Sequence, residues 1–246
     1  MGSLGTVQFN DVSGSAANAI DDILPKAYEE TWDGTSHSSS FHSFGSSTQS
    51  GSVDYRLPAL SFGDMSLSLT ATYDPNAGSG PASAGGVAGN DHSGVAYTAK
   101  IDSGMGLAVG GGIEEVTTAS TATGASDLTR ATGYVTYSNG PLSIGYQEMF
   151  QNTENAGDGT AQAPDVEGDG IGIAFSQDNM SFSYAEVTEE VADISATTSL
   201  ETEMTALQAT YTMGAMTLGA SMYETDNPEG TTGKYEETEL SVSFAF

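Results

Sequence analysis

The sequence of 246 residues contains no cysteine, one tryptophan and only five basic residues, which stand against 33 acidic ones. Without cysteine, neither a disulfide framework nor a thiolate metal site is possible. The formal net charge of -28 argues against nucleic acid as a partner, because binding to phosphates needs clustered lysine and arginine. Cations and cationic solutes are the partners that such a charge favours.

Two further absences narrow the function. No run of about 18 apolar residues occurs, so we expect no transmembrane helix. Neither a G-x-S-x-G nor an H-E-x-x-H motif is present, and two of the three histidines, His37 and His42, lie in a serine-rich stretch. The sequence therefore predicts that the protein is not an enzyme.

What the sequence does contain, from residue 50 onward, is a succession of segments in which apolar and polar residues alternate. The last of them sets Leu240, Val242, Phe244 and Phe246 against serine and alanine. A period of two is typical of a β-strand with one apolar face. Strands are expected at 50–58, 64–73, 92–102, 104–116, 126–138, 141–151, 167–177, 180–190, 201–213, 215–225 and 235–246.

The connections between these segments alternate in length. Short turns are expected at Gly140, Asn179 and Gly214, where Asn-Gly and Asp-Asn pairs give strong hairpin signals. The other connections are long and polar, at 74–91, 117–125, 152–166 and 225–234. Short turns at one end and long loops at the other indicate an all-β, up-and-down antiparallel barrel of outer-membrane type, with two different rims.

The polar face of the strands decides where such a barrel would lie. With a further strand at Thr6–Asn10 there are about 12 strands, too many for side chains to fill the interior. We therefore expect the polar face to surround water and the apolar face to contact lipid. Aromatic residues near strand ends suit the girdles of a bilayer interface: Tyr73, Phe150, Tyr211, Tyr223 and Phe246. A soluble β protein with an apolar interior is the alternative.

Residues 11–49 break this pattern. Apolar residues from Ala17 to Tyr28 are spaced roughly as in a helix, which predicts a short helix that Pro25 interrupts. A polar stretch without periodicity follows. A connection of about 40 residues in a hairpin protein is usually functional, so we expect 11–49 either to cover a rim or to fold inward.

Several motifs together resemble the general diffusion porins of alphaproteobacteria. They are the run "LGTVQFNDVSGSAANAIDDILPKAYEETWDG", the later "SVDYRLPAL" and "MSLSLTATYDPNAG", and the final "LSVSFAF". The resemblance covers essentially the whole chain and implies a trimeric porin in the outer membrane of a Gram-negative bacterium. It also implies that 11–49 is the inward-folded constriction loop of a single domain, 1–246. The final strand, with Leu240, Val242, Phe244 and Phe246, resembles the family's signal for outer-membrane assembly.

The family has 16 strands, whereas about 12 are expected here. The sequence starts near the fifth strand of the family pattern, so the simplest expectation is that four strands and the leader precede it. A closed 12-stranded barrel is the alternative.

Charged residues give candidates for selectivity. The loop carries five acidic residues, Asp21, Asp22, Glu29, Glu30 and Asp33, and carboxylates this close together also suit Ca²⁺. Strand parity places Arg56, Lys100 and Arg130 on the polar face, where they resemble the basic wall of a porin constriction.

These observations predict a water-filled channel for ions and small hydrophilic solutes that prefers cations and needs no cofactor. The alternative is an acidic, calcium-stabilised extracellular β protein with a structural or adhesive role.

Overall fold

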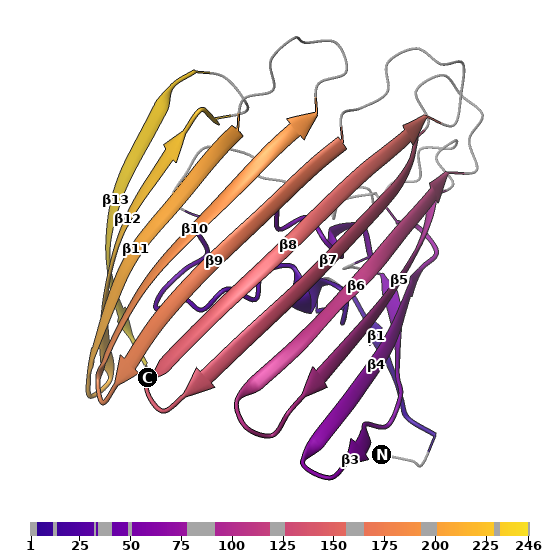
Figure 1. The fold of residues 1–246 in the computed structure, drawn as a ribbon, viewed down its shortest axis with the longest axis horizontal. Helices are drawn as coiled ribbons and strands as arrows, with labels where there is room; N and C mark the ends of the chain where they lie inside the picture. The colour runs from indigo at the N-terminus through magenta and orange to yellow at the C-terminus, as the bar shows by residue number, and fades with distance from the viewer. Residues whose placement is uncertain are drawn as a thin grey trace. The chain divides into compact units, whose positions relative to one another are not determined.

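The computed structural model describes residues 4–11, 14–31, 33, 41–48, 51–77, 92–118, 126–155, 165–192, 201–228 and 232–245. These residues form thirteen strands and two single-turn 3-10 helices, and the strands make one sheet whose order follows the chain (Figure 1). In this part of the chain, no helix is long and apolar enough to cross a membrane.

The elements have the following bounds. The strands are β1 (Thr6–Asn10), β2 (Ser52–Arg56), β3 (Leu60–Phe62), β4 (Met65–Asp74), β5 (His92–Asp102), β6 (Leu107–Thr118), β7 (Ser126–Asn139), β8 (Leu142–Asn155), β9 (Asp165–Gln177), β10 (Met180–Ala192), β11 (Glu201–Met213), β12 (Met216–Asp226) and β13 (Lys234–Phe244). The 3-10 helices are η1 (Asn18–Ile20) and η2 (Ser46–Thr48).

Contacts divide the chain into two units, and each is described by itself. Unit 1 consists of residues 1–21, 42–133 and 149–166. Unit 2 consists of residues 22–41, 134–148 and 167–246.

The strand prediction is confirmed, with one interruption. β2 and β3 are both hydrogen-bonded to β4, with Val53 opposite Tyr73 and Leu60 opposite Leu67. Pro58 lies between them and has no N–H to give to the ladder, so one strand is split into two. The order β1-β2-β4 to β13 thus has twelve positions, as the sequence predicts.

The short turns also follow the sequence. Gly140 and Gly214 have φ angles of 57° and 62°, and Asp178 before Asn179 has a φ of 53°. Glycine adopts this left-handed conformation without strain, and aspartate tolerates it better than most residues. The hairpins β7–β8, β9–β10 and β11–β12 therefore turn within two residues.

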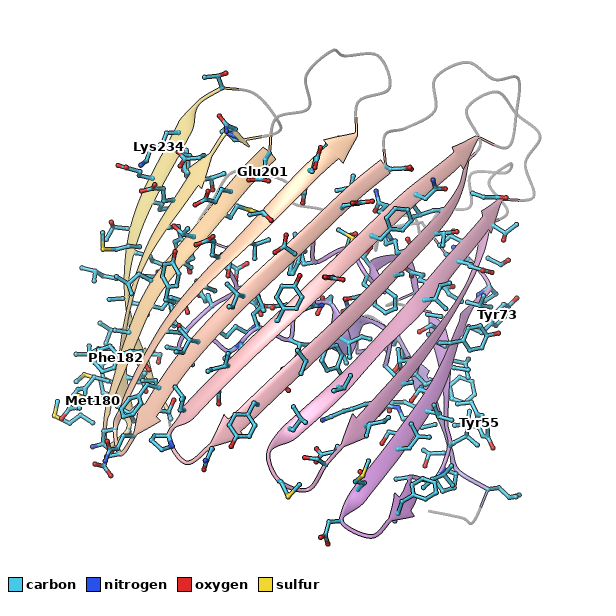
Figure 2. All side chains as sticks on the ribbon, viewed as in Figure 1. Tyr55, Tyr73, Met180, Phe182, Glu201 and Lys234 are labelled. Atoms are coloured by element: carbon cyan, nitrogen blue, oxygen red, sulfur yellow. The ribbon has the colours of Figure 1, made fainter. Side chains whose placement is uncertain are left out.

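In each unit, one face of the sheet carries the large apolar side chains and leaves them exposed. We call it the open face. In unit 1, Leu107, Val109 and Ile113 of β6 are exposed on the open face. Glu114, which directly follows Ile113 and points to the opposite face, is fully buried. In unit 2, Phe182 and Tyr184 of β10 are exposed, and Ser183 is buried. Met180 and Phe182 lie near the short turns, whereas Glu201 and Lys234 lie at the opposite strand ends (Figure 2).

The other face, the covered face, is buried and carries polar side chains together with apolar ones such as Val187 and Met204. Its buried polar side chains include Asp54, Thr72 and Glu114 in unit 1 and Gln147, Glu189 and Gln208 in unit 2. Tyr223, expected in an interface girdle, is 2% exposed and lies on this face. Buried polar groups and exposed apolar ones are the reverse of the arrangement in a water-soluble domain. The described residues of 11–49, which we call the inner loop, cover this face in both units.

The prediction of a short helix in the inner loop is wrong. Only η1, three residues long, is helical between Ala17 and Tyr28. An α-helix needs backbone N–H groups to bond carbonyls four residues earlier. Here the N–H groups of Ile23, Ala27 and Tyr28 bond to side chains of the sheet instead.

Candidate functional site: the inner loop and the covered face

In unit 2 the inner loop is fastened to the sheet through its own backbone. The N–H of Ile23 donates to Gln147 Oε1 at 2.8 Å, and that of Ala27 donates to Ser183 Oγ at 2.8 Å. The next N–H, of Tyr28, donates to Gln208 Oε1 at 3.0 Å. Ile23, Ala27 and Tyr28 of the loop are thus bonded to β8, β10 and β11, respectively.

Gln208 and Glu189 complete the attachment in this unit. Gln208 Nε2 donates a hydrogen bond of 2.6 Å to the carbonyl oxygen of Glu29, so the amide side chain of Gln208 is bonded to two loop residues, Tyr28 and Glu29. Further along, the N–H of Phe41 donates to Glu189 Oε2 at 3.1 Å. Buried polar groups are stable only when they have partners, and the loop backbone supplies partners for these two side chains.

In unit 1 two buried carboxylates hold the loop in the same way. The N–H of Ala16 donates to Asp54 Oδ2 at 2.9 Å. The N–H of Gly45 donates to Glu114 Oε2 at 3.1 Å, and Thr48 Oγ1 donates to Glu114 Oε1 at 3.0 Å. A carboxylate that accepts several bonds from one segment fixes the position of that segment.

Glycines of the covered face give the loop its close approach. A Cβ on Gly145 would lie 2.6 Å from Pro25 Cδ, and one on Gly170 would lie 2.8 Å from Leu24 Cδ1. In unit 1, a Cβ on Gly112 would lie 2.6 Å from Phe44 Cζ. Because no side chain fits at these positions, apolar loop residues pack directly on the strand backbone.

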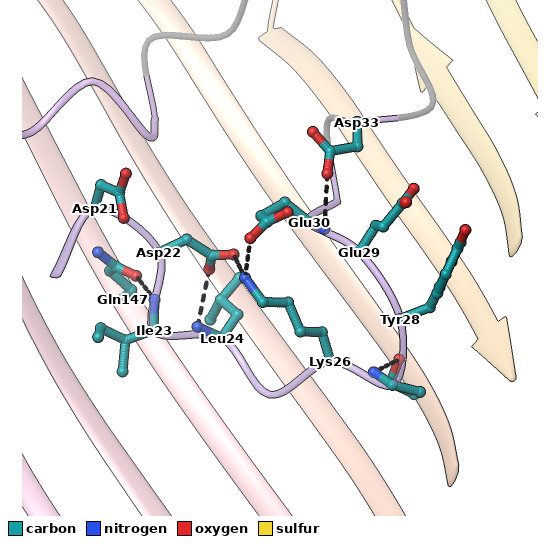
Figure 3. A network of polar contacts seen from close by, with 12 residues as sticks. Asp21, Asp22, Ile23, Leu24, Lys26, Tyr28, Glu29, Glu30, Asp33 and Gln147 are labelled. Atoms are coloured by element: carbon teal, nitrogen blue, oxygen red, sulfur yellow. Dashed lines mark hydrogen bonds and ion pairs between the residues drawn. The ribbon is translucent and has the colours of Figure 1, made fainter. Parts of the chain in front are cut away.

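Two of the loop's acidic residues, Asp22 and Glu30, contact one lysine in unit 2 (Figure 3), whereas Glu29 Oε2 accepts the hydroxyl of Tyr223 at 3.5 Å. Lys26 Nζ lies 2.7 Å from Asp22 Oδ2 and 2.6 Å from Glu30 Oε1. Asp22 Oδ1 also accepts the N–H of Leu24 at 3.0 Å. The N–H of Glu30 donates to Asp33 Oδ2 at 3.3 Å. Of the five predicted acidic residues, Asp21 belongs to unit 1, where Asn18 Nδ2 donates to its Oδ2 at 2.8 Å.

Burial and neighbouring charges shift the pKa values of this group. Burial and the hydrogen bond with Glu30 raise the pKa of Asp33 to about 6. Burial alone would raise the pKa of Glu30, but hydrogen bonds with Asp33 and Lys26 outweigh it and lower that pKa to about 2. Desolvation of Lys26 is likewise outweighed by Asp22 and Glu30, and the pKa of Lys26 rises.

The three predicted basic residues lie in unit 1, and each is paired with a carboxylate there. Arg130 Nη1 lies 3.0 Å from Glu114 Oε2, and Arg56 Nη2 lies 2.9 Å from Asp54 Oδ2. Lys100 Nζ lies 3.8 Å from Asp102 Oδ2. Arg130 also donates to Gln151 and Ser47. These arginines therefore help to orient carboxylates that hold the loop; their role as a basic wall stays a prediction.

The predicted assembly residues lie on the open face of unit 2. Leu240, Val242 and Phe244 are 81%, 58% and 59% exposed on β13. Phe246, like Trp32 and His37, lies outside the described residues. The assembly role of this strand stays a prediction.

Sequence reasoning missed Lys26 and the side chains that accept loop N–H groups. For Lys26 a signal exists, since acidic residues stand four positions before and four positions after it. For Gln147, Ser183 and Gln208 the signal is only their polar face. In the part of the chain that the structure describes, no group of three or more histidine, aspartate or glutamate side chains is placed to hold a metal ion.

Comparison with known proteins identifies the fold. No protein-family model matches the sequence, and no curated protein matches it. A porin refined at 1.8 Å resolution has 15% identity and a TM-score of 0.66, over 100% of this chain and 79% of that one. An anion-selective porin from Comamonas acidovorans has 11% identity and a TM-score of 0.68, over 100% of this chain and 76% of that one.

At these identities the similarity shows the fold. The chain has the fold of porins, which are β-barrels, and the predicted all-β, up-and-down antiparallel class is confirmed. Among the described residues the order of the sheet begins at β1 and ends at β13, and these two strands are not paired with each other.

Proposed function

We propose that this protein is an outer-membrane porin, a water-filled channel for passive diffusion of ions and small hydrophilic solutes. The observation that carries the proposal is the reversed distribution of side chains. Each unit exposes large apolar residues on one face and buries polar ones on the other. In lipid such an open face is stable, and a polar face can surround water. The porin fold supports the same function.

We also propose that the inner loop narrows this channel and that Asp21, Asp22, Glu29, Glu30 and Asp33 act at the constriction. The backbone bonds to Gln147, Ser183 and Gln208 support this, because they hold the loop over the covered face of unit 2. Diffusion through such a channel needs no cofactor. The sequence suggests Ca²⁺ at the loop carboxylates, but Lys26 Nζ already lies 2.7 Å from Asp22 Oδ2 and 2.6 Å from Glu30 Oε1, so Ca²⁺ is not part of the proposed function.

Charge supports a preference for cations. All five basic residues lie within 4.0 Å of a carboxylate, so 33 acidic residues leave a large uncompensated negative charge. A potential of this sign concentrates cations and repels anions. One of the similar porins is anion-selective, so the porin fold does not fix the sign of the selectivity. We infer that the charge of this chain fixes it.

The assembly and the location are further parts of the proposal. The resemblance to alphaproteobacterial porins supports a homotrimer in the bacterial outer membrane.

Swelling of protein-loaded liposomes tests the channel. In isotonic solutions of small sugars, we expect vesicles with the refolded protein to swell, and vesicles in a large dextran to stay unchanged. Small cationic solutes should enter faster than anionic solutes of equal size. Vesicles that stay unchanged in every solute, with the protein inserted and folded, would contradict the proposal and favour the adhesive alternative.

A further inference from the structure

Lys26 is the only lysine or arginine among the first 55 residues, and it lies within an acidic segment. Residues 22–33 also carry Asp22, Glu29, Glu30 and Asp33, which gives four negative charges against one positive charge. The ammonium group of Lys26 lies between two of these carboxylates, at 2.7 Å from Asp22 Oδ2 and 2.6 Å from Glu30 Oε1 (Figure 3).

This arrangement is not the usual pair of ions on a helix surface. The spacing of four residues on either side is helical, but the chain here is irregular and its N–H groups bond to the sheet. We call Lys26 with Asp22 and Glu30 the Lys26 clamp. It is joined to the backbone through Asp22, whose Oδ1 accepts the N–H of Leu24 at 3.0 Å. Lys26 links Asp22 to Glu30 across the segment.

The clamp is partly buried. The Asp22 side chain is 3% exposed, whereas those of Lys26 and Glu30 are 32% and 36% exposed. A buried carboxylate without a counter-charge is costly, so Lys26 stabilises the ionised form of Asp22. Lys26 is therefore within reach of solvent and at the same time occupies the position that a mobile cation would take.

We propose that Lys26 is a specificity-determining residue of the channel: a built-in counter-ion that lowers the cation preference and keeps Ca²⁺ from binding between Asp22 and Glu30. The inference rests on the proposed channel function. Without Lys26, the carboxylates of Asp22 and Glu30 would lie on either side of a position that a mobile cation can take. Several carboxylates near one another are the ligands that Ca²⁺ prefers.

The three bonds of Ile23, Ala27 and Tyr28 to the sheet do not involve the Lys26 side chain. We therefore expect the loop to keep its position when this side chain is changed. A change of ion selectivity then reports the charge and not a displaced loop.

Single-channel recordings on Lys26→Gln test the proposal. One unit of charge about 8 Å from a passing ion, with a Debye length of about 10 Å at 0.1 M salt, changes the cation-to-anion permeability ratio about twofold. We expect Lys26→Gln to raise that ratio by about this factor. We also expect Ca²⁺ at roughly 1 mM to reduce its current, a concentration typical of weak carboxylate sites.

Lys234→Gln is the matched control. Lys234 Nζ also lies between two carboxylates, 2.6 Å from Glu224 Oε1 and 3.3 Å from Glu236 Oε1, at the start of β13 and outside the inner loop. Its replacement removes the same charge from the protein. Lys234→Gln and Lys26→Arg should both keep the wild-type permeability ratio and its insensitivity to Ca²⁺.

The absence of cysteine permits a second test inside the assembled channel. In Lys26→Cys, the only thiol can react with aminoethyl methanethiosulfonate, which attaches an ammonium group through a disulfide and releases methanesulfinate. The reaction should return the permeability ratio and the Ca²⁺ response to wild-type values during one recording. The neutral methyl reagent should change neither.

The outcomes separate the inference from the channel proposal. If wild-type protein forms no channels, both are wrong. If channels form but Lys26→Gln and Lys234→Gln behave alike, only the role of Lys26 is wrong. If Lys26→Gln and Lys26→Cys form no channels while Lys234→Gln does, Lys26 is required for folding, and the selectivity role is likewise overturned.

Discussion

Replacement of Gly145 by alanine should push the inner loop away from the sheet. Gly145 lies on the covered face of β8, and its added Cβ would lie 2.6 Å from Pro25 Cδ. Ordinary contact begins at 3.4 Å, so the proline ring must withdraw by about 0.8 Å. Cδ of proline is bonded to the backbone nitrogen, and therefore no side-chain rotation can relieve the clash. The loop backbone itself has to move.

The cost follows from this displacement. Overpacking of this kind typically costs about 1–3 kcal/mol. Replacing glycine by alanine in a strand recovers about 0.5–1 kcal/mol through the unfolded chain. We therefore expect a net loss of about 1–2 kcal/mol in the free energy of unfolding. The free energy of unfolding is measured by urea titration of the protein in lipid vesicles, with gel mobility reporting the folded fraction. The N–H of Ile23, two residues before Pro25, should also exchange faster, because its bond to Gln147 is strained.

Gly133→Ala is the matched control. Gly133 lies in β7 and is exposed, and a Cβ there would meet nothing within 4 Å. Its replacement should leave the stability unchanged or raise it slightly. Pro25→Ala removes the atoms that clash with the new Cβ, so the double variant with Gly145→Ala should be more stable than the sum of the single effects predicts, by about 1 kcal/mol. Equal stability of Gly145→Ala and Gly133→Ala, with no coupling to Pro25, would refute the close packing of loop on sheet.

Three further changes test other parts of the structure. Gln208→Leu removes the partner of the Tyr28 N–H and of the Glu29 carbonyl, and should cost about 1–3 kcal/mol and speed amide exchange at Tyr28. Leu240→Arg places a charge on the open face and should lower the free energy of unfolding in vesicles by about 2–4 kcal/mol. Ser243→Arg, on the other face of β13, should lower it much less. Equal losses would contradict a lipid-facing open face. Asp33, with a pKa of about 6, should take up a proton between pH 7 and pH 5, so the loop loses one negative charge and the cation-to-anion permeability ratio falls. In Asp33→Asn this fall should disappear, and its persistence there would assign the titration to another group.

The strands and their two faces could be predicted from the sequence because both depend on short-range order. Alternation along 239–246 places Leu240 and Val242 on one face, and turn residues such as Gly140 and Gly214 limit each strand. Even the split between β2 and β3 can be traced to Pro58. The same alternation places Arg56 beside the buried Asp54.

The conformation of the inner loop could not be predicted in this way. Apolar spacing from Ala17 to Tyr28 indicates a helix, yet partners more than a hundred residues away, such as Gln147 and Gln208, take the N–H groups that a helix would use. Tertiary bonds of this kind leave no periodic trace in the sequence. Lys26 does leave a signal, with acidic residues four positions before and four positions after it, but that spacing indicates a helix and not the irregular conformation that the chain has there.

Planar-bilayer conductance of the refolded protein, with the reversal potential measured in a KCl gradient, tests the central claim most directly. A cation-selective porin should give discrete current steps and a reversal potential of the sign that preferential cation flow sets. Folded, inserted protein that gives no steps would contradict the channel, and steps with an anion-selective reversal potential would contradict the role assigned to its acidic residues.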